Sequence, residues 1–522
     1  MSVVLAEKSK VTLDGENLTL EQVVAVARYG AKVELHPSAK EKVVKSREYV
    51  DQLIAGNKTV YGITTGFGKF SDVFISKEDA KTLQRNLIMS HATGVGEPLA
   101  SEVVRGILLL RANALAKGFS GIRLSTLQTL IKVLNAGIVP VVPEKGSLGA
   151  SGDLAPLSHM VLVLLGEGEA FYKERRMSGR DALAQAGIEP VVLEGKEGLA
   201  LINGTQVMTA IAALAVWDAE ILCESANITS ALTLEALEGI LAAFDPKIHA
   251  VRPHPGQIET AKKIRQLTEG STFLADEHHP RVQDAYALRC ISQVHGPSGD
   301  AVAYVKKVVE TEINSATDNP LIFPDQDSVL SGGNFHGQPI ALAMDFLGIA
   351  MAELANISER RLERLVNPSL SGLPAFLTPN GGLNSGFMIV QYSAASLVSE
   401  NKVLAHPASV DSIPSSANQE DHVSMGTIAA RKARSIIENT GHVLGMELLA
   451  ACQGLDLRSG KENLSLGKGS ESAYRLVRSK VPTLKEDRVM YMDINLAKEL
   501  VISGKLANAV KFELDRKGIP LA

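Results

Sequence analysis

The sequence contains few aromatic side chains and few cysteines. Phe, Trp and Tyr make up 4% of the 522 residues, with a single Trp217, so the core has to be built from aliphatic side chains. The abundance of Ala and Leu among these favours helices. Cys223, Cys290 and Cys452 are widely spaced and odd in number, so they form neither a disulfide framework nor a Cys-x-x-Cys metal site. We therefore expect a protein of a reducing compartment, the cytoplasm.

An excess of charge of one sign is also missing, and no apolar run is long. Lys and Arg number 53 against 58 Asp and Glu, a formal net charge of −5, with both signs interspersed. This leaves no basic surface for nucleic acid or for an anionic membrane. The longest apolar run, 207–217, falls short of the roughly 20 residues that span a bilayer. We expect neither a nucleic-acid nor a membrane partner.

The composition and the apolar pattern of the sequence change near residue 205. Before that point, Gly-rich stretches interrupt short helical patterns, whereas later segments are long, rich in Ala, Leu and Ile, and apolar at three- and four-residue steps. The long segments are 207–243, 298–316, 340–366, 382–405 and 423–452. They predict a mainly α fold, with a loop-rich N-terminal part (1–205) and a long antiparallel helical bundle (206–522), which together form one catalytic unit.

The segment 340–366 carries apolar residues around much of a helix. These include Met344, Ile349, Met351 and Leu354. The pattern indicates burial on more than one side, either inside a large monomeric bundle or against another copy of the chain. The pattern alone leaves both open.

Ala150-Ser151-Gly152, within a Gly-rich stretch, could undergo an unusual backbone reaction. In a tight bend the nitrogen of Gly152 can attack the carbonyl carbon of Ala150, because glycine is the least hindered residue for that role. Loss of one water would close a five-membered ring. Loss of the Ser151 hydroxyl as a second water would leave an electrophilic methylene. Most such tripeptides are ordinary turns, so a plain turn is the alternative.

Residues 146–159 (GSLGASGDLAPLSH) resemble the signature of the aromatic amino acid ammonia-lyase family, whose members form a 4-methylidene-imidazol-5-one (MIO) group from their own Ala-Ser-Gly. Six other blocks resemble the family in the same order along the chain. They are YGITTGFG (61–68), QRNLIMSHATGVG (84–96), LINGTQ (201–206), VQDAYALRC (282–290), SGGNFHGQP (331–339) and SSANQEDHVSMG (415–426). The resemblance implies a C–N lyase that needs no metal or diffusible cofactor. It also implies a homotetramer whose active sites draw residues from more than one chain.

The resemblance assigns roles around this group. Asn203 would hydrogen-bond the ring oxygen and stabilise its developing negative charge. Asp153 would assist the cyclisation, and Phe335 would pack close to the ring. Considered without the resemblance, Asp153 would be a helix N-cap and Phe335 a core aromatic.

Further residues would act on the substrate. By resemblance, Tyr61 in a Gly-rich loop would remove the β-proton. Arg289 follows Tyr286 by three residues and so shares a helical face with it. By resemblance, Arg289 would bind the substrate carboxylate, Tyr286 would assist ring formation, and Gln283 would contact substrate. The alternatives are a turn tyrosine for Tyr61 and an ion pair for Arg289.

Ser90, His91 and Glu420 would set the substrate. Ser-His resembles the family members that act on histidine, and the Glu420 carboxylate can accept an imidazole N–H, whereas a phenyl ring would leave that charge unpaired. The implied reaction is deamination of L-histidine to trans-urocanate and ammonia. Ser-His also resembles some tyrosine aminomutases, so a tyrosine or phenylalanine ammonia-lyase or aminomutase is the alternative. A helical scaffold protein without the group is the alternative from another class.

One run of possible metal ligands stands apart from these blocks. Residues 276–279 read Asp-Glu-His-His. Four consecutive side chains cannot converge on one ion without severe folding of the backbone. We expect a solvated turn there and no metal site in the protein.

Overall fold

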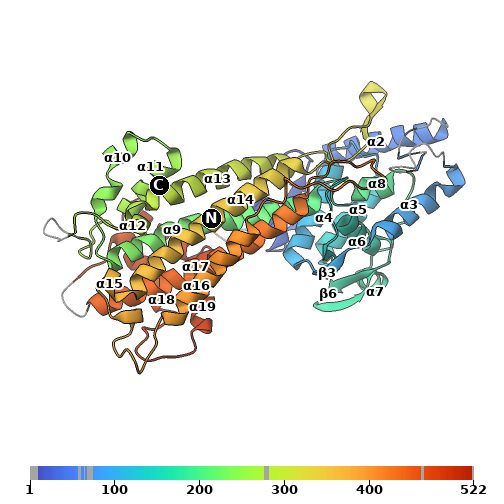
Figure 1. The fold of residues 1–522 in the computed structure, drawn as a ribbon. Helices are drawn as coiled ribbons and strands as arrows, with labels where there is room; N and C mark the ends of the chain where they lie inside the picture. The colour runs from blue at the N-terminus through green and yellow to red at the C-terminus, as the bar shows by residue number, and fades with distance from the viewer. Residues whose placement is uncertain are drawn as a thin grey trace. The chain divides into compact units, whose positions relative to one another are not determined.

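The computed structural model describes residues 10–56, 60, 62–63, 65–66, 75–275, 281–459 and 464–519. Helices make up 61% of the structure, and its strands are short (Figure 1), which confirms the mainly α prediction. The chain forms two compact units. Unit 1 consists of 1–214, 306–345 and 407–431, and unit 2 of 215–305, 346–406 and 432–522. The predicted N-terminal part therefore lies within unit 1, and two later segments pack with it. That both parts form one catalytic unit stays a prediction.

Unit 1 combines short helices with small sheets. Its helices are α1 (Leu20–Ala27), α2 (Pro37–Ala55), α3 (Lys77–His91), α4 (Ser101–Ala116), α5 (Leu124–Ala136), α6 (Leu154–Leu164), α7 (Gly179–Gln185), α8 (Glu197–Ile202) and the 3-10 turn η4 (Pro324–Gln326). Its strands are β1 (Lys10–Leu13), β2 (Lys32–Leu35), β3 (Val95–Pro98), β4 (Val139–Pro140), β5 (Pro143–Lys145), β6 (Glu169–Tyr172), β7 (Arg175–Ser178), β8 (Leu321–Phe323) and β9 (Ser328–Leu330). The pair β1–β2 is parallel, whereas β3–β5, β4–β6–β7 and β8–β9 are antiparallel. Helix α4 is buried on nearly all sides and forms the centre of the unit.

Unit 2 is helical. Its own elements are η3 (Leu241–Phe244), α10 (Pro246–Ala250), α11 (Pro255–Leu267), α12 (Tyr286–Arg289), α15 (Pro368–Ser371), η5 (Ala375–Leu377), α16 (Met388–Leu404), α18 (Lys468–Arg478), α19 (Tyr491–Ile502) and α20 (Lys505–Arg516). Residues of both units come from α9 (Gln206–Ala236), α13 (Ile291–Glu312), α14 (Gln338–Val366) and α17 (Gly426–Ser459). Along the chain, α9, α14 and α17 each begin in unit 1 and end in unit 2, whereas α13 begins in unit 2 and ends in unit 1.

The five long segments predicted from the sequence correspond to α9, α13, α14, α16 and α17. Several predicted bounds differ from the structure. Helix α13 runs from Ile291 to Glu312 and not from 298 to 316, and α16 begins at Met388 and not at residue 382. The first prediction ran too far, because α9 ends at Ala236 and not at residue 243. Glu238 has a positive φ of 51°, and the Gly239 nitrogen donates to the Leu234 carbonyl at 2.8 Å. This is the left-handed turn that ends many helices, and the apolar pattern continues past it into η3.

Among the described residues, two helices are long and apolar enough to cross a membrane by length and composition alone. They are α9 and α14, with mean hydropathy of 1.5 and 1.6 over their most apolar stretches. Within the structure, 78% and 67% of those stretches are buried. Core helices have this same character, so the two helices are weak grounds for a membrane protein.

A buried ion pair lies among the long helices inside unit 2. Arg361 and Glu447 are both 0% exposed, and Arg361 Nε and Nη2 donate to the two carboxylate oxygens at 2.6 and 2.9 Å. The same oxygens accept from Thr233 Oγ1 at 2.7 Å and Ser358 Oγ at 2.6 Å. Arg361 Nη1 lies 3.2 Å from His295 Nε2. The network joins α9, α13, α14 and α17.

His295 makes the stability of this region depend on pH. Burial and the Arg361 guanidinium hold the pKa of His295 well below its usual value. The neutral ring therefore donates from Nδ1 to Asn227 Oδ1 at 2.9 Å. The unfolded chain binds a proton at this ring near pH 6.5, whereas the folded protein does not. The stability that the neutral ring contributes is thus present above about pH 6.5 and is lost as the pH falls below it.

We expect His295→Gln to weaken this pH dependence. Between about pH 7 and pH 5, its urea midpoint should fall less than that of the parent protein, because glutamine binds no proton in either state. His406→Gln, at an exposed position of unit 2, is the matched control and should keep the parent's dependence. Parallel curves for all three proteins would contradict the prediction.

Candidate active site

The Ala-Ser-Gly segment lies in unit 1, immediately before α6, and bends against the start of α9. Gly152 has a φ of +75° and forms a β-bridge with Gly204, and the nitrogen of Asp153 donates to the Gly204 carbonyl at 2.7 Å. A Cβ at position 152 would lie 2.2 Å from that carbonyl oxygen. Only glycine therefore fits this bend, in both conformation and space.

Asp153 is fully buried, and its carboxylate joins three segments. Oδ2 accepts from the nitrogens of Val207 and Met208, both at 2.9 Å, in the first turn of α9. Oδ1 accepts from Ser147 Oγ at 2.8 Å and from Thr427 Oγ1. Burial raises the pKa of this carboxyl, although its four hydrogen bonds oppose the shift. Asp153 precedes α6 but does not cap it with its side chain, and it caps α9 instead.

Asn203 follows α8, and its side chain reaches the Ala-Ser-Gly segment. Its Nδ2 donates to the carbonyl oxygen of Ser151 at 3.0 Å. Its own carbonyl accepts from Arg111 Nη1 at 2.9 Å, and the same guanidinium donates to Gln206 Oε1 at 2.6 Å and to the Ala200 carbonyl. Burial lowers the pKa of Arg111 to about 10, and the side chain is 0% exposed. This buried guanidinium thus holds the backbone at Asn203 in place.

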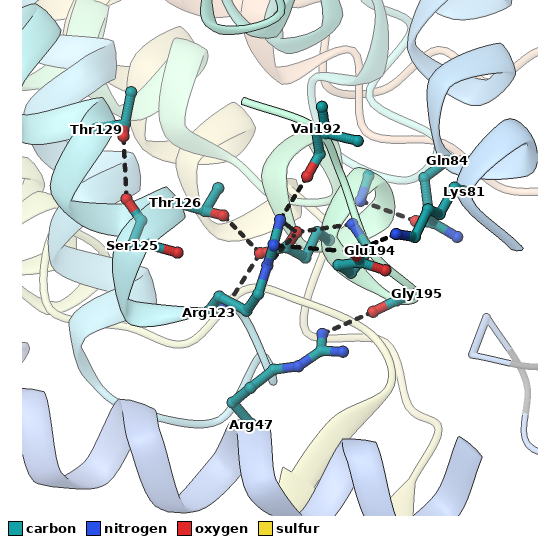
Figure 2. A network of polar contacts seen from close by, with 12 residues as sticks. Arg47, Lys81, Gln84, Arg123, Ser125, Thr126, Thr129, Val192, Glu194 and Gly195 are labelled. Atoms are coloured by element: carbon teal, nitrogen blue, oxygen red, sulfur yellow. Dashed lines mark hydrogen bonds and ion pairs between the residues drawn. The ribbon is translucent and has the colours of Figure 1, made fainter. Parts of the chain in front are cut away.

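A second polar network fixes the start of α8 (Figure 2). The buried carboxylate of Glu197 accepts from Arg123 Nη2 at 2.5 Å and from Thr126 Oγ1 at 2.7 Å. Arg47 Nη1 donates to the carbonyl of Gly195 at 2.8 Å, as Figure 2 shows. Because α8 is held at both ends, the position of Asn203 is set by the packing of unit 1.

Glu420 closes a tight hairpin that begins at Ser415. The Ser415 nitrogen donates to the Glu420 carbonyl at 2.9 Å, and the reverse bond is 3.2 Å long. Positions 416–418, none of them glycine, have left-handed φ values of 52°, 54° and 66°. This conformation costs each residue about 1 kcal/mol, and such strain is often found at functional sites. Ser415 Oγ donates to Glu420 Oε2 at 3.0 Å, and Ser151 Oγ donates to Oε1 at 3.2 Å.

A pocket of about 250 Å³ opens between these groups, all within unit 1. Its lining includes Ser90, His91, Thr93, Ser147, Gly149, Ala150, Gly152, Ser415 and Glu420. The predicted substrate-selecting residues and the Ala-Ser-Gly segment therefore share one small cavity. Its lining presents hydroxyl, imidazole and carboxylate groups that a small polar molecule can contact.

Ser90 and His91 end α3 at the rim of the pocket. Ser90 Oγ donates to the Leu87 carbonyl at 3.1 Å and lies 3.0 Å from His91 Nδ1. Burial lowers the pKa of His91, whereas a hydrogen bond with the Leu87 carbonyl and the charge of Glu420 partly oppose this shift. When the Ser90 hydroxyl donates to the Leu87 carbonyl, its oxygen can accept a hydrogen bond from Nδ1–H of His91. Nε2 of the neutral His91 ring is then an acceptor.

The other predicted residues lie elsewhere in the described structure or outside it. Phe335 is half-buried in the turn before α14. In unit 2, the Arg289 guanidinium lies 4.4 Å from the ring centre of Tyr286, so these two share a face as predicted. Tyr286 is 71% exposed, and Gln283 is exposed. The roles of these four residues stay predictions.

Tyr61 and the run 276–279 lie outside the described residues. Within the described ranges, no group of three or more His, Cys, Asp or Glu side chains is placed to hold a metal ion.

Sequence reasoning missed several supporting residues. They are Arg111, Ser147, Ser415 and Thr427. Ser147 and Ser415 lie inside the family-like blocks, and Arg111 is the one charged residue in the mostly apolar stretch 106–116 of α4. The sequence shows each of these as a polar residue in an unusual position, but it does not show which residue each one contacts.

The chain has close similarity to known proteins. A family model described as aromatic amino acid lyase matches residues 18–479. A histidine ammonia-lyase of Alkaliphilus oremlandii is 64% identical over 502 residues, covering 96% of this chain and 98% of that protein. The crystal structure of histidine ammonia-lyase from Trypanosoma cruzi is 46% identical, with a TM-score of 0.90, covering 97% of this chain and 96% of that one. Tyrosine aminomutase from Streptomyces globisporus is 40% identical, with a TM-score of 0.93, covering 98% and 100%.

Proposed function

Because the chain belongs to the aromatic amino acid lyase family, we propose that it is a histidine ammonia-lyase that converts L-histidine to trans-urocanate and ammonia. The observation that carries this proposal is the shared pocket of Ser90, His91, Glu420 and the Ala-Ser-Gly bend. Side chains that can select an imidazole thus lie beside the segment that would form the MIO group.

The residues around Ala150-Ser151-Gly152 fit an MIO group. The left-handed Gly152 lies against Gly204 where no Cβ has room, and Asn203 Nδ2 already donates to the Ser151 oxygen that would become the ring oxygen. Asp153 holds the bend against α9. Residues 150–152 would hold this group, which would supply an electrophilic methylidene carbon for the substrate amine.

The chain's own side chains bind the substrate and move its protons. Glu420 accepts an N–H of the imidazole, and Ser90 and His91 bound the same end of the pocket. By the family resemblance, Arg289 binds the substrate carboxylate, Gln283 contacts the substrate and Tyr286 assists ring formation. These three residues need not come from the subunit that supplies Glu420. The Tyr61 hydroxyl takes the β-proton of histidine.

Two further residues act on the ring. Asn203 stabilises negative charge at the Ser151 oxygen through its Nδ2–H. Phe335 packs near the ring, where a bulky apolar side chain helps to exclude water.

The proposal includes a homotetramer with shared active sites, in the cytoplasm. Apolar side chains exposed on neighbouring helices of unit 2 support self-association. Tyr304, Phe346 and Ile349 are 55%, 44% and 46% exposed, and the rings of Tyr304 and Phe346 lie edge to face at 6.0 Å. Such a patch is more often covered than solvated.

The test is substrate turnover. We expect purified protein to produce the ultraviolet absorbance of urocanate from L-histidine, because an imidazole N–H can donate to the Glu420 carboxylate. A phenyl ring has no such donor, so L-phenylalanine should give no unsaturated acid. L-tyrosine, whose hydroxyl is a donor, is the substrate that decides between this proposal and its alternative. Turnover of tyrosine but not histidine would reject the proposal.

Tyrosine aminomutase activity is the second candidate, favoured by the 40% identity and the shared fold. A β-amino acid product would support it. A helical scaffold protein is excluded if the intact mass is lower than the encoded mass by two waters, because ring formation releases both. An unmodified mass without activity would support the scaffold.

A further inference from the structure

The geometry points to a second role for Glu420, as the proton donor that removes the Ser151 hydroxyl when the chain forms its own prosthetic group. The inference rests on the proposed function, since it concerns how the group of that site arises. It would give one carboxylate two tasks, first in maturation and later in binding substrate.

Hydrogen bonds hold the two groups of Ser151 on which such an elimination depends, its hydroxyl and its carbonyl oxygen. Its leaving hydroxyl donates to Glu420 Oε1 at 3.2 Å, and its carbonyl oxygen accepts from Asn203 Nδ2 at 3.0 Å. When the Cα proton of Ser151 leaves, negative charge develops on that carbonyl oxygen. The amide of Asn203 is in place to stabilise the charge while the hydroxyl departs on the Glu420 side.

Glu420 is positioned for this task by its hairpin. Ser415 Oγ binds Oε2, and the paired backbone of Ser415 and Glu420 fixes the base of the side chain, so Oε1 remains for Ser151. The three left-handed residues at 416–418 make the hairpin tight. Strain of this kind persists where the surrounding structure requires one geometry. Ser415 is thus a positioning residue.

The carboxyl of Asp153, which is fully buried next to the bend, is already occupied. Asp153 accepts four hydrogen bonds, from Ser147, Thr427, Val207 and Met208, so its oxygens serve to hold the bend. Among the described residues, the hydrogen bond of the Ser151 hydroxyl goes to Glu420. The Asp153 carboxyl therefore holds the bend, and the Glu420 carboxyl is the one that can protonate the leaving hydroxyl.

The step balances without an oxidant or reductant. The nitrogen of Gly152 first bonds to the carbonyl carbon of Ala150, and one water leaves as the ring C=N bond forms. The Cα–H bond of Ser151 then breaks, its electron pair forms the Cα=Cβ bond, and the Cβ–Oγ pair leaves with oxygen. Oγ takes a proton from the Glu420 carboxyl and departs as the second water. The Cα proton passes to solvent, from which Glu420 is reprotonated.

Intact mass of newly synthesised full-length chain tests the inference independently of activity. We expect the parent protein to reach the encoded mass minus two waters. Glu420→Gln should accumulate at minus one water, with the second loss slowed by about 10²-fold or more, the size of a general-acid contribution. Fragmentation of the peptide containing residues 150–152 should place the retained oxygen on Ser151.

Two other variants complete the experiment. Ser415→Ala leaves the carboxyl but removes its hydrogen bond, and should slow the second loss about tenfold. Ser158→Ala removes a hydroxyl of α6 that donates to the Leu154 carbonyl, and is the matched control, which should lose both waters at the parent rate. If Glu420→Gln does not fold, as judged by circular dichroism, the Ser415→Ala time course decides.

The outcomes separate the inference from the proposed function. Loss of two waters at the parent rate in Glu420→Gln, or in Ser415→Ala when the first variant is unfolded, would overturn the role of Glu420 and leave the proposed function standing. A parent protein of unmodified mass would overturn the proposed function itself.

Discussion

Replacing Ser151 by alanine is expected to abolish ammonia release from histidine and to leave a folded protein. The methylidene carbon would derive from Cβ of Ser151, and alanine offers no leaving group there, so no electrophile can form. We expect kcat to fall by about 10³-fold or more, as when the central group of a covalent mechanism is removed. The lost hydrogen bond from Ser151 to Glu420 is only partly buried, so stability should fall by about 1 kcal/mol or less.

Activity and intact mass measured together give a sharp result. Ser151→Ala should retain the helical circular dichroism of the parent but lack the loss of the second water. Ser158→Ala is the matched control, because this buried serine of α6 donates only to the Leu154 carbonyl at 2.8 Å. It should keep the activity of the parent. Near-normal turnover by Ser151→Ala would refute the electrophile mechanism.

Replacing Arg361 by methionine is expected to cause a large loss of stability. The change leaves Glu447 charged and 0% exposed, with only the hydroxyls of Thr233 and Ser358 as partners. Removing one member of a buried ion pair costs about 3–5 kcal/mol, because the remaining charge stays desolvated. The midpoint of urea unfolding measures the loss.

Two comparisons separate this effect from the loss of a side chain. Arg516→Met removes an exposed arginine of α20 that binds Glu513 at 2.8 Å, and should shift the midpoint little. Arg361→Met combined with Glu447→Gln should recover part of the loss, because no buried charge is left unpaired. If Arg361→Met and Arg516→Met shift the midpoint equally, the buried pair does not stabilise the fold in this way.

The long helices were predictable because their signal is local. Apolar residues at three- and four-residue steps define a helix face wherever the helix packs, so α9, α13, α14, α16 and α17 followed from the pattern. The end of α9 did not follow, since the apolar pattern continues beyond Ala236 while the chain turns left-handed at Glu238. The apolar residues of α14 were predicted to be buried on more than one side. In the structure Met351 is buried, whereas Ile349 is 46% exposed.

The candidate site was predictable only as a set of residues. The Ala-Ser-Gly bend, Asn203 and Glu420 came from blocks along the sequence, and the structure places them together. Their supports were not predictable. The alternative role for Asp153 was a cap of the helix that follows it, yet its side chain accepts from the first turn of α9, which lies more than 50 residues later in the chain.

The sequence by itself determined the helix pattern, the tripeptide with its reactive chemistry, and the types of side chain available to bind an imidazole. These depend on residues close together in the chain. Only the tertiary structure decided which groups touch Ser151 and which hold Asp153, Asn203 and Glu420 in place. Those hydrogen bonds join residues up to 274 positions apart, and a partner at such a distance is set by how segments pack, which local spacing does not encode.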